Sequence, residues 1–139
     1  MRALVTGGAG FIGSHMVDEL VSAGAEVHVL DNLSTGSKRN VNPRAFFHEV
    51  DIRNEAIRSL VSDIRPDVVF HMAAQVDVQR SVKQPQEDAS INLVGTVNLL
   101  EACRQAEVRK IIYASSCAVY GNTVKERMEE TDPAAPISY

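Results

Sequence analysis

Gly7-Gly8-Ala9-Gly10-Phe11-Ile12-Gly13 lies close to the N-terminus and spaces its glycines as G-x-x-G-x-x-G. The short apolar run Arg2–Thr6 precedes these glycines, and Ile12, Met16 and Leu20 follow at helical spacing. Between a strand and a helix, glycines allow a tight turn and let the backbone approach a pyrophosphate, while the helix N-terminus offers unpaired N–H groups. The pattern predicts a dinucleotide-binding turn; the alternative is a Gly-rich turn that holds no ligand.

Strand-like and helix-like patterns alternate along the rest of the chain. Four further strands are predicted, namely Val27–Leu30, Ala45–Val50, Val68–His71 and Ile111–Ala114. The predicted helices are one that ends at Gly24, one with Ile57, Leu60, Val61 and Ile64 that ends before Pro66, and a long one that begins before Asn92 and carries Leu93, Val97, Leu100 and Cys103. Asp31–Arg44 and the chain after Gly121 are polar and predict loops. This alternation is typical of an α/β, Rossmann-like, doubly wound parallel sheet of about five strands, for which right-handed crossovers give the order 3-2-1-4-5.

The composition limits what the chain does. Its 139 residues suit one domain, which we place at residues 1–139. Hydrophobic residues make up 45% and the formal net charge is -4, so no basic field favours a nucleic-acid partner. No uncharged apolar run approaches the ~20 residues of a membrane helix. Cys103 and Cys117 are the only cysteines and lack metal-ligand spacing, which predicts no metal site and a reducing, cytoplasmic compartment.

Two acids follow predicted strands at positions suited to a nucleotide. Asp31 comes about 20 residues after the glycines, where an acid accepts hydrogen bonds from the adenosine ribose and repels a 2′-phosphate. This favours NAD over NADP, although Asp31 could instead cap its own turn with Asn32. At Asp51-Ile52, a contact between Asp51 and the adenine amino group, with Ile52 on the ring, competes with a cap by Asp51 on a helix that begins near Asn54.

Two further strand ends reach the same carboxyl edge of the sheet. In His71-Met72-Ala73-Ala74 the small residues would let a cofactor lie close to the backbone, and we interpret His71 as a packing residue beside it. Ser115-Ser116 follows the last strand, where a hydroxyl could bond a substrate oxygen or simply cap a turn. Neither serine belongs to a G-x-S-x-G elbow, which disfavours hydrolase chemistry, and Cys117 is expected to be a buried, inert thiol.

Four motifs, T-G-G-A-G-F-I-G-S-H, L-D-N-L-S-T-G, H-M-A-A-Q and Y-A-S-S-C-A-V-Y-G, make the chain resemble an extended short-chain dehydrogenase/reductase, most closely the UDP-glucose 4-epimerase group. The resemblance covers Met1 to Tyr139 and implies NAD as a tightly bound prosthetic group. With the motif glycines, the residues expected at the cofactor are Gly7, Gly10, Phe11, Ile12, Gly13, Asp31, Asn32, Leu33, Ser34, Thr35, Gly36, Asp51, Ile52, Met72, Ala73, Ala74, Gln75, Val76 and Asn92. The resemblance also implies that Ser116 is the active-site Ser/Thr and that the substrate is a UDP-sugar. It further implies a homodimer whose subunits pair through helices that include Asn92–Gln105.

The reaction implied by the resemblance is 4-epimerisation of a UDP-sugar, as in galactose and nucleotide-sugar metabolism. A tyrosinate would remove the proton of the sugar 4-hydroxyl, and the C4 hydride would pass to bound NAD and return to the other face of a 4-keto intermediate. In related 4,6-dehydratases an Asp-Glu pair precedes V-Y-G, whereas Cys117 and Ala118 stand here. Dehydratase chemistry is therefore disfavoured, and so are the decarboxylases, which usually keep the Glu.

The catalyst of the resembled family, Tyr-x-x-x-Lys, is the one departure from its pattern. Neither Tyr113 nor Tyr120 has a Lys four residues on, and counting from Pro136 places the catalytic Tyr directly after Tyr139. We therefore expect the cofactor-binding part of a longer enzyme, with the substrate domain absent and without activity of its own. The alternative from another class is a non-catalytic NAD-binding module, as in redox-sensing regulators of this fold.

Overall fold

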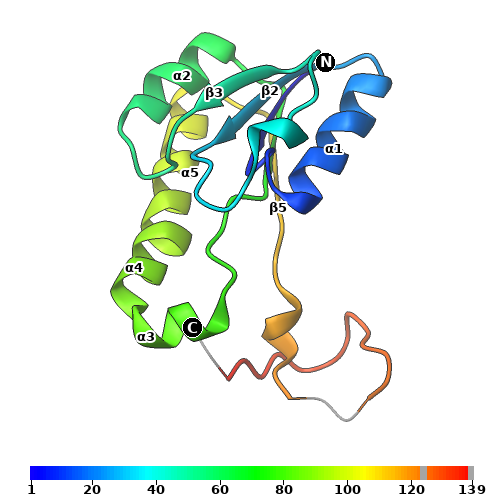
Figure 1. The fold of residues 1–139 in the computed structure, drawn as a ribbon, viewed down its shortest axis with the longest axis vertical. Coiled ribbons are helices and arrows are strands. Elements are labelled where there is room, and N and C mark those ends of the chain that lie inside the picture. The colour runs from blue at the N-terminus through cyan, green and yellow to red at the C-terminus, as the bar shows by residue number, and fades with distance from the viewer. Residues whose placement is uncertain (123–124, 138–139) are drawn as a thin grey trace.

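Five parallel strands in the order β3-β2-β1-β4-β5 form the centre of the computed structural model, which describes residues 1–122 and 125–137 (Figure 1). They are β1 (Arg2–Thr6), β2 (Glu26–Asp31), β3 (Phe46–Glu49), β4 (Val68–His71) and β5 (Lys110–Tyr113). β1 pairs with β2 on one side and with β4 on the other. The predicted strand order is confirmed, whereas Tyr139, after which the catalytic Tyr is expected, lies outside the described residues.

Helices connect the strands and cover both faces of the sheet (Figure 1). They are α1 (Phe11–Ser22), α2 (Ala56–Ile64), α3 (Val78–Lys83), α4 (Pro85–Ala89), the π-helical turn η2 (Ser90–Gly95) and α5 (Thr96–Gln105), with 3₁₀ turns η1 (Lys38–Asn40) and η3 (Cys117–Tyr120). The sequence predicts α1, α2 and α5. It misses α3, which is too short to display a helical repeat of apolar residues, whereas the predicted long helix that begins before Asn92 corresponds to η2 and α5, directly preceded by α4.

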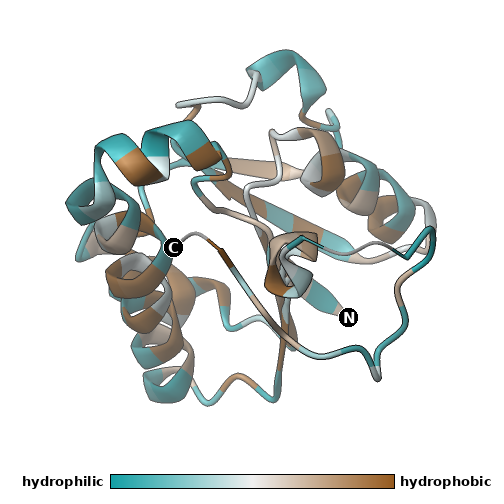
Figure 2. Cartoon of the chain, turned by 90° about the horizontal axis from the view of Figure 1, so that it is seen from below, coloured by the Kyte–Doolittle hydropathy of each residue, from teal (hydrophilic) through white to brown (hydrophobic). Residues whose placement is uncertain are grey.

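Two apolar layers hold these helices on the sheet. Successive residues of β1 point to opposite faces, so that Leu4 packs toward α2 and α5 while Val5 packs toward α1. Fully burying one such side chain contributes ~1.5–3 kcal/mol. In Figure 2 hydrophobic residues colour parts of the strands and alternate with hydrophilic ones along the helices. The buried members of the layer under α1 are Val5, Val17, Val21, Val27 and Val29, and those under α2 and α5 include Leu4, Leu30, Ile57, Val61, Val69 and Leu99.

The long third helix forms as predicted, but most of the residues that predict it do not face the core. Leu93, Val97 and Leu100 are 65%, 55% and 44% exposed. The core face of α5 is instead Leu99, Ala102 and Cys103, which are buried against the sheet. The helix thus carries two apolar stripes, and only one of them is covered by the described part of this chain.

The carboxyl ends of the strands meet at one edge of the sheet. Thr6 at the end of β1 pairs with Leu30 on one side and with His71 on the other, and His71 pairs with Tyr113. The connection after β1 runs through α1 on one face, while the connection after β4 runs toward α5 on the other face. Such a reversal opens a crevice beyond the strand ends, which is where α/β sheets bind their ligands.

Candidate cofactor-binding site

The first glycine and the last glycine of the turn are required by the backbone itself. Gly7 has a φ of 69°, and a Cβ there would lie 2.7 Å from the backbone nitrogen of Ala73. A Cβ on Gly13 would lie only 2.1 Å from the carbonyl oxygen of Gly7. These glycines therefore let the turn reverse direction, let α1 pack against it, and let the strand end after β4 approach it.

Gly10 is less crowded than the other two. A Cβ there would meet only the Gly7 carbonyl oxygen, at 3.2 Å, within 4 Å. Gly10 is the N-cap of α1 and makes no side-chain cap hydrogen bond, and the next residues, Phe11 and Ile12, are 80% and 65% exposed. The first N–H groups of a helix have no partner within it and carry partial positive charge. The turn thus leaves room and donors for a phosphate group, and the residues fit a dinucleotide.

Asp31 ties the glycine turn to the loop that follows β2. The residue is 8% exposed, and its carboxylate accepts the Ala9 N–H at 3.0 Å on Oδ2 and the Leu33 N–H at 2.8 Å on Oδ1. The alternative in which Asp31 caps its own turn is therefore part of the structure, although the partner is Leu33 rather than Asn32. A carboxylate has about four acceptor positions, so two remain unused by these donors, and the expected contact with the ribose hydroxyls stays a prediction.

The loop after β2 packs directly on the glycine turn. A Cβ on Gly36 would lie 2.9 Å from the backbone of Ala9, so the two segments are in close contact. The Ala9 carbonyl accepts the Ser37 N–H at 3.0 Å and the Asn40 side-chain Nδ2 at 2.9 Å. The sequence gives no signal for Asn40, which lies in a polar loop and acts on a residue far away along the chain. Ser34 and Thr35 are exposed in this loop.

Asp51 is saturated by protein donors. Oδ1 accepts the Arg53 N–H and Nε at 2.8 and 2.9 Å, and Oδ2 accepts Arg53 Nη2 at 2.7 Å and Asn32 Nδ2 at 2.8 Å. The Arg53 guanidinium, helped by Asn32, holds the pKa of Asp51 far below its usual range. Asp51 does not cap α2, because the Ala56 N–H is accepted by Asn54. Its contact with adenine stays a prediction, and it would require one of these four donors to move.

Ile52 belongs mainly to the protein core. It is 5% exposed and packs with the layer under α2 and α5. Its side chain lies against Gly95, where a Cβ would come within 2.7 Å of the Ile52 δ-methyl. Packing of this side chain on an adenine ring therefore stays a prediction, and it concerns at most the exposed edge of the residue.

The segment from Met72 to Val76 is held by an amide clamp. Asn92 accepts the Gln75 N–H on Oδ1 at 2.8 Å, and its Nδ2 donates to the Gln75 carbonyl at 2.9 Å. The Gln75 side chain donates in turn to Asp88 at 2.8 Å. Ala74 and Val76 are exposed at the same edge. Asn92 thus acts on the backbone under the expected cofactor, which the helical pattern alone does not reveal.

His71 does more than pack. Its Nδ1 lies 2.6 Å from the Thr6 hydroxyl and its Nε2 lies 2.9 Å from the Thr96 hydroxyl. The ring is buried, and burial lowers its pKa to about 4, so that it is neutral near pH 7. The interpretation of His71 as a packing residue is therefore incomplete.

Ser116 stands at the start of η3 and is exposed. Its Oγ accepts the Ala118 N–H at 3.1 Å, so the expected capping role is present. A hydroxyl that accepts one hydrogen bond keeps its own proton for another partner. The neighbouring Cys117 is exposed, which corrects the expectation of a buried thiol; the buried one is Cys103, whose pKa burial raises to about 11.

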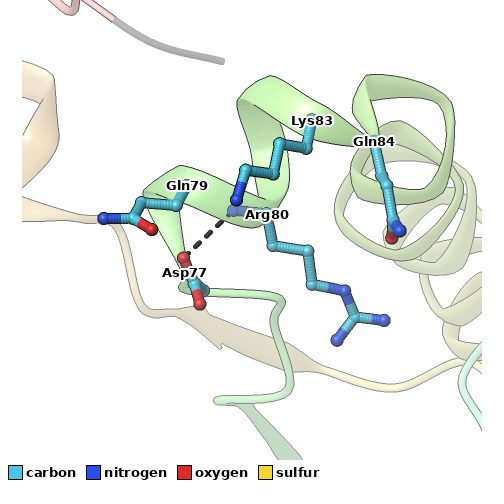
Figure 3. Close-up of a pocket in the computed structure, with 5 residues that line it drawn as sticks. All are labelled: Asp77, Gln79, Arg80, Lys83 and Gln84. Carbon is cyan, nitrogen blue, oxygen red and sulfur yellow. Dashed lines mark hydrogen bonds between the residues drawn. The ribbon is translucent and has the colours of Figure 1, made fainter.

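A polar hollow on α3 adjoins this edge and has no counterpart in the sequence predictions. Figure 3 shows the five residues that line it, Asp77, Gln79, Arg80, Lys83 and Gln84. Asp77 caps α3 by accepting the Arg80 N–H at 3.0 Å, and the Arg80 guanidinium pairs with Glu87 at 2.7 Å. The hollow is open to solvent and begins one residue beyond Val76.

Residues 1–122 and 125–137 offer neither a cluster of metal ligands nor a membrane-spanning helix. This part of the chain contains no group of three His, Cys, Asp or Glu side chains placed to hold a metal ion. Among the same residues, none of the helices has the length and apolar character needed to cross a membrane.

Comparison with known proteins shows the family of the chain that carries this site. A model of the NAD dependent epimerase/dehydratase family matches residues 3–139. The chain belongs to this family. The resemblance that the four motifs indicate is thereby confirmed.

Relatives within the epimerase/dehydratase family cover nearly the whole chain. It is 46% identical to a putative UDP-glucose 4-epimerase of Methanocaldococcus jannaschii, over 97% of the chain and 45% of that protein. It is 45% identical to a UDP-glucose 4-epimerase of Mycolicibacterium smegmatis, over 99% of the chain and 46% of that protein. The chain thus spans less than half the length of these relatives.

Solved structures of the family share the fold. A Thermus thermophilus UDP-glucose 4-epimerase in complex with NAD is 50% identical, with a TM-score of 0.93, over 99% of this chain and 45% of that one. A Thermotoga maritima UDP-glucose 4-epimerase with UDP-glucose is 45% identical, with a TM-score of 0.92, over 99% of this chain and 46% of that one. The predicted Rossmann-like fold is therefore that of the family.

Proposed function

We propose that this chain is the NAD-binding part of an NAD-dependent 4-epimerase that acts on UDP-glucose and UDP-galactose. The observation that carries the proposal is the glycine at position 10, where only the Gly7 carbonyl oxygen comes near, at the uncapped N-terminus of α1 and next to the carboxylate of Asp31. The likeness to UDP-glucose 4-epimerases, one of them solved with NAD, supports this choice within the family.

Each part of the strand edge has a task in this proposal. The N–H groups after Gly10 hold the pyrophosphate, and Asp31 and the loop to Gly36 hold the adenosine ribose. The segment Met72–Val76 lies under the nicotinamide end. NAD, when bound, supplies an acceptor and donor of hydride. Asp31 selects NAD because its carboxylate, fixed by two backbone N–H groups, repels a 2′-phosphate.

Ser116 is the catalytic residue that the described part of the chain provides. Its exposed hydroxyl would donate a hydrogen bond to the sugar 4-oxygen while its acceptor side stays engaged with Ala118. Removing it should lower turnover about 10²-fold or more. The neighbours Cys117 and Ala118 carry no carboxyl group, which supports epimerisation over water elimination.

The full-length protein that contains this chain provides the test. It should release NAD on denaturation, detected by mass spectrometry, and should convert UDP-galactose to UDP-glucose in a coupled assay. The 139 residues alone should bind NAD without turnover, because neither Tyr113 nor Tyr120 has a Lys four residues on, as the Tyr-x-x-x-Lys catalyst of the resembled family requires. A full-length protein that carries NAD but converts none of several UDP-sugars would instead favour a non-catalytic NAD-binding module.

We further propose that two copies of the protein pair through η2 and the outward stripe of α5. Leu93, Val94, Val97 and Leu100 form an exposed apolar surface there. Val97→Glu should turn the dimer into a monomer in light scattering, while Val82→Glu, at an exposed apolar residue of α3, should not. A dimer that survives Val97→Glu would contradict this pairing.

A further inference from the structure

We propose that His71, together with Thr6 and Thr96, is a positioning residue that fixes the backbone from Ala73 to Gln75 for the cofactor. The inference rests on the proposed function, since that segment forms part of the NAD site only if the chain binds NAD. It assigns a task to three side chains that none of the cofactor contacts above includes.

The three side chains form one chain of hydrogen bonds between β1, β4 and α5. The Ala73 N–H donates to Thr6 Oγ1 at 3.3 Å, and Thr6 Oγ1 lies 2.6 Å from His71 Nδ1. His71 Nε2 lies 2.9 Å from Thr96 Oγ1, which donates to the Asn92 carbonyl at 2.7 Å. Thr6 and His71 are buried, so water does not compete for these bonds.

The direction of every bond in this chain follows from its ends. Thr96 has one proton, and the Asn92 carbonyl can only accept, so Thr96 must accept from His71 Nε2–H. A neutral ring that carries its proton on Nε2 leaves Nδ1 bare, and Nδ1 then accepts from the Thr6 hydroxyl. Thr6 in turn accepts the Ala73 N–H. The network therefore assigns the neutral Nε2–H tautomer to His71.

Asn92 closes the chain into a ring. Its carbonyl ends the hydrogen-bond chain, while its side chain binds both the N–H and the carbonyl of Gln75. Asn92 lies in the π-helical turn η2, and π-helical turns occur often at functional sites. Residues 73 to 75 are thus held at one end through Thr6 and at the other through Asn92, with His71 between them.

Residues 73 to 75 border the glycine turn, so their position affects the shape of the proposed NAD site. A Cβ on Gly7 would come within 2.7 Å of the Ala73 nitrogen, which shows how closely the two backbones approach. If the ring opened at His71, Ala73 would lose the support of an oriented Thr6 hydroxyl. We expect the segment to loosen while the sheet register, which rests on backbone pairing, persists.

Matched variants at Thr96 test the ring in the full-length protein. Thr96→Val keeps the shape of the side chain but removes its hydroxyl, and Thr96→Ser restores it. Thr96→Val should accelerate amide hydrogen exchange locally at Ala73 and Gln75 and weaken NAD binding about tenfold, as expected for the loss of a buried hydrogen bond. Thr96→Ser should return both toward the wild-type values, which a merely space-filling residue would not do.

The tautomer of His71 can be measured in the wild-type protein, so this test does not depend on whether a variant folds. With ¹⁵N-labelled histidine, and His71→Gln to assign the signal, the nitrogen shifts should report a neutral Nε2–H ring at pH 7. An Nδ1–H or doubly protonated ring, or unchanged exchange at both amides in a folded Thr96→Val protein, would overturn the proposal. Wild-type protein that binds no NAD would refute the proposed function, and the expected tenfold weakening of NAD binding would fall with it. The tautomer of His71 and the amide exchange rates would still test the ring of hydrogen bonds.

Discussion

Substitutions at two glycines of the same turn, Gly10 and Gly13, should affect cofactor binding and folding stability separately. Replacing Gly10 by Val adds a branched side chain where only the Gly7 carbonyl oxygen lies within reach of a Cβ, and the N-cap backbone, with φ −81° and ψ 178°, suits any residue. The fold should lose ~1 kcal/mol, the usual cost of a poor N-cap, together with a small cost for the Gly7 oxygen, which lies 3.2 Å from the new Cβ and must give way slightly. Gly13→Ala instead forces a Cβ to within 2.1 Å of a backbone oxygen, so the turn must move at a cost of ~1–3 kcal/mol or more.

NAD affinity should respond in the opposite order to stability, because Gly10→Val should weaken binding more than Gly13→Ala does. The Val side chain at Gly10 would stand where the pyrophosphate meets the first N–H groups of α1. Losing two charge-assisted hydrogen bonds of ~1.5–3 kcal/mol each weakens binding by ~3–6 kcal/mol, or on the order of 10²–10⁴-fold in Kd. Calorimetric titration with NAD gives the affinity, and thermal and urea unfolding give the stability of the same preparations.

The result that would refute this reasoning is a folded Gly10→Val protein that binds NAD like the wild type, because the glycine turn would then not be the cofactor site. A Gly13→Ala protein as stable as the wild type would refute the packing argument separately. Circular dichroism on each variant shows whether the fold persists, so the two outcomes are not confused.

The remaining predictions concern two titratable side chains. Asp31→Ala should narrow the preference for NAD over NADP, measured by titration with both nucleotides; equal affinities already in the wild type would remove the role given to Asp31. Burial lowers the pKa of His71 from 6.5 to about 4 in the folded protein. The neutral ring therefore makes its full contribution to the free energy of unfolding above about pH 6.5, and this contribution is lost as the pH falls toward 4. The total loss is ~3 kcal/mol. Urea unfolding across this range should show the loss, His71→Gln should flatten it, and a wild-type curve that stays flat between pH 6.5 and 4 would show that His71 is not buried in its neutral form.

The features that could be predicted from the sequence are the ones set by neighbours along the chain. A strand, a glycine turn and a helix follow one another within residues 2–22, and the spacing of their apolar and glycine residues reflects local geometry. Asp31 could be found in the same way, since it ends the next strand. Strand order then follows from the handedness of the crossovers, which is a general property of parallel sheets.

The features that could not be predicted depend on which elements meet. Thr6 and His71 become neighbours only when β1 and β4 pair in register, and Asn40 reaches Ala9 only after the loop folds back. The repeat of Leu93, Val97 and Leu100 marks a helix but does not show which side the sheet covers. Periodicity identifies an apolar stripe, whereas its burial is decided by the packing partner.

Two acids that look alike in the sequence differ in the acceptor capacity that the fold leaves them. Asp31 holds the Ala9 and Leu33 N–H groups and keeps acceptor positions for a ligand. Asp51 is occupied by three donors of Arg53 and one of Asn32, and the favourable pairing with the guanidinium would have to be given up before an adenine amino group could bind. Position along the chain therefore identifies both as candidates, but the donors already bound to each carboxylate make Asp31 the better ligand. Because Asn32 bonds Asp51 and is the residue next to Asp31, the same loop fixes both acids, and nucleotide selectivity is expected to depend on that loop as a unit.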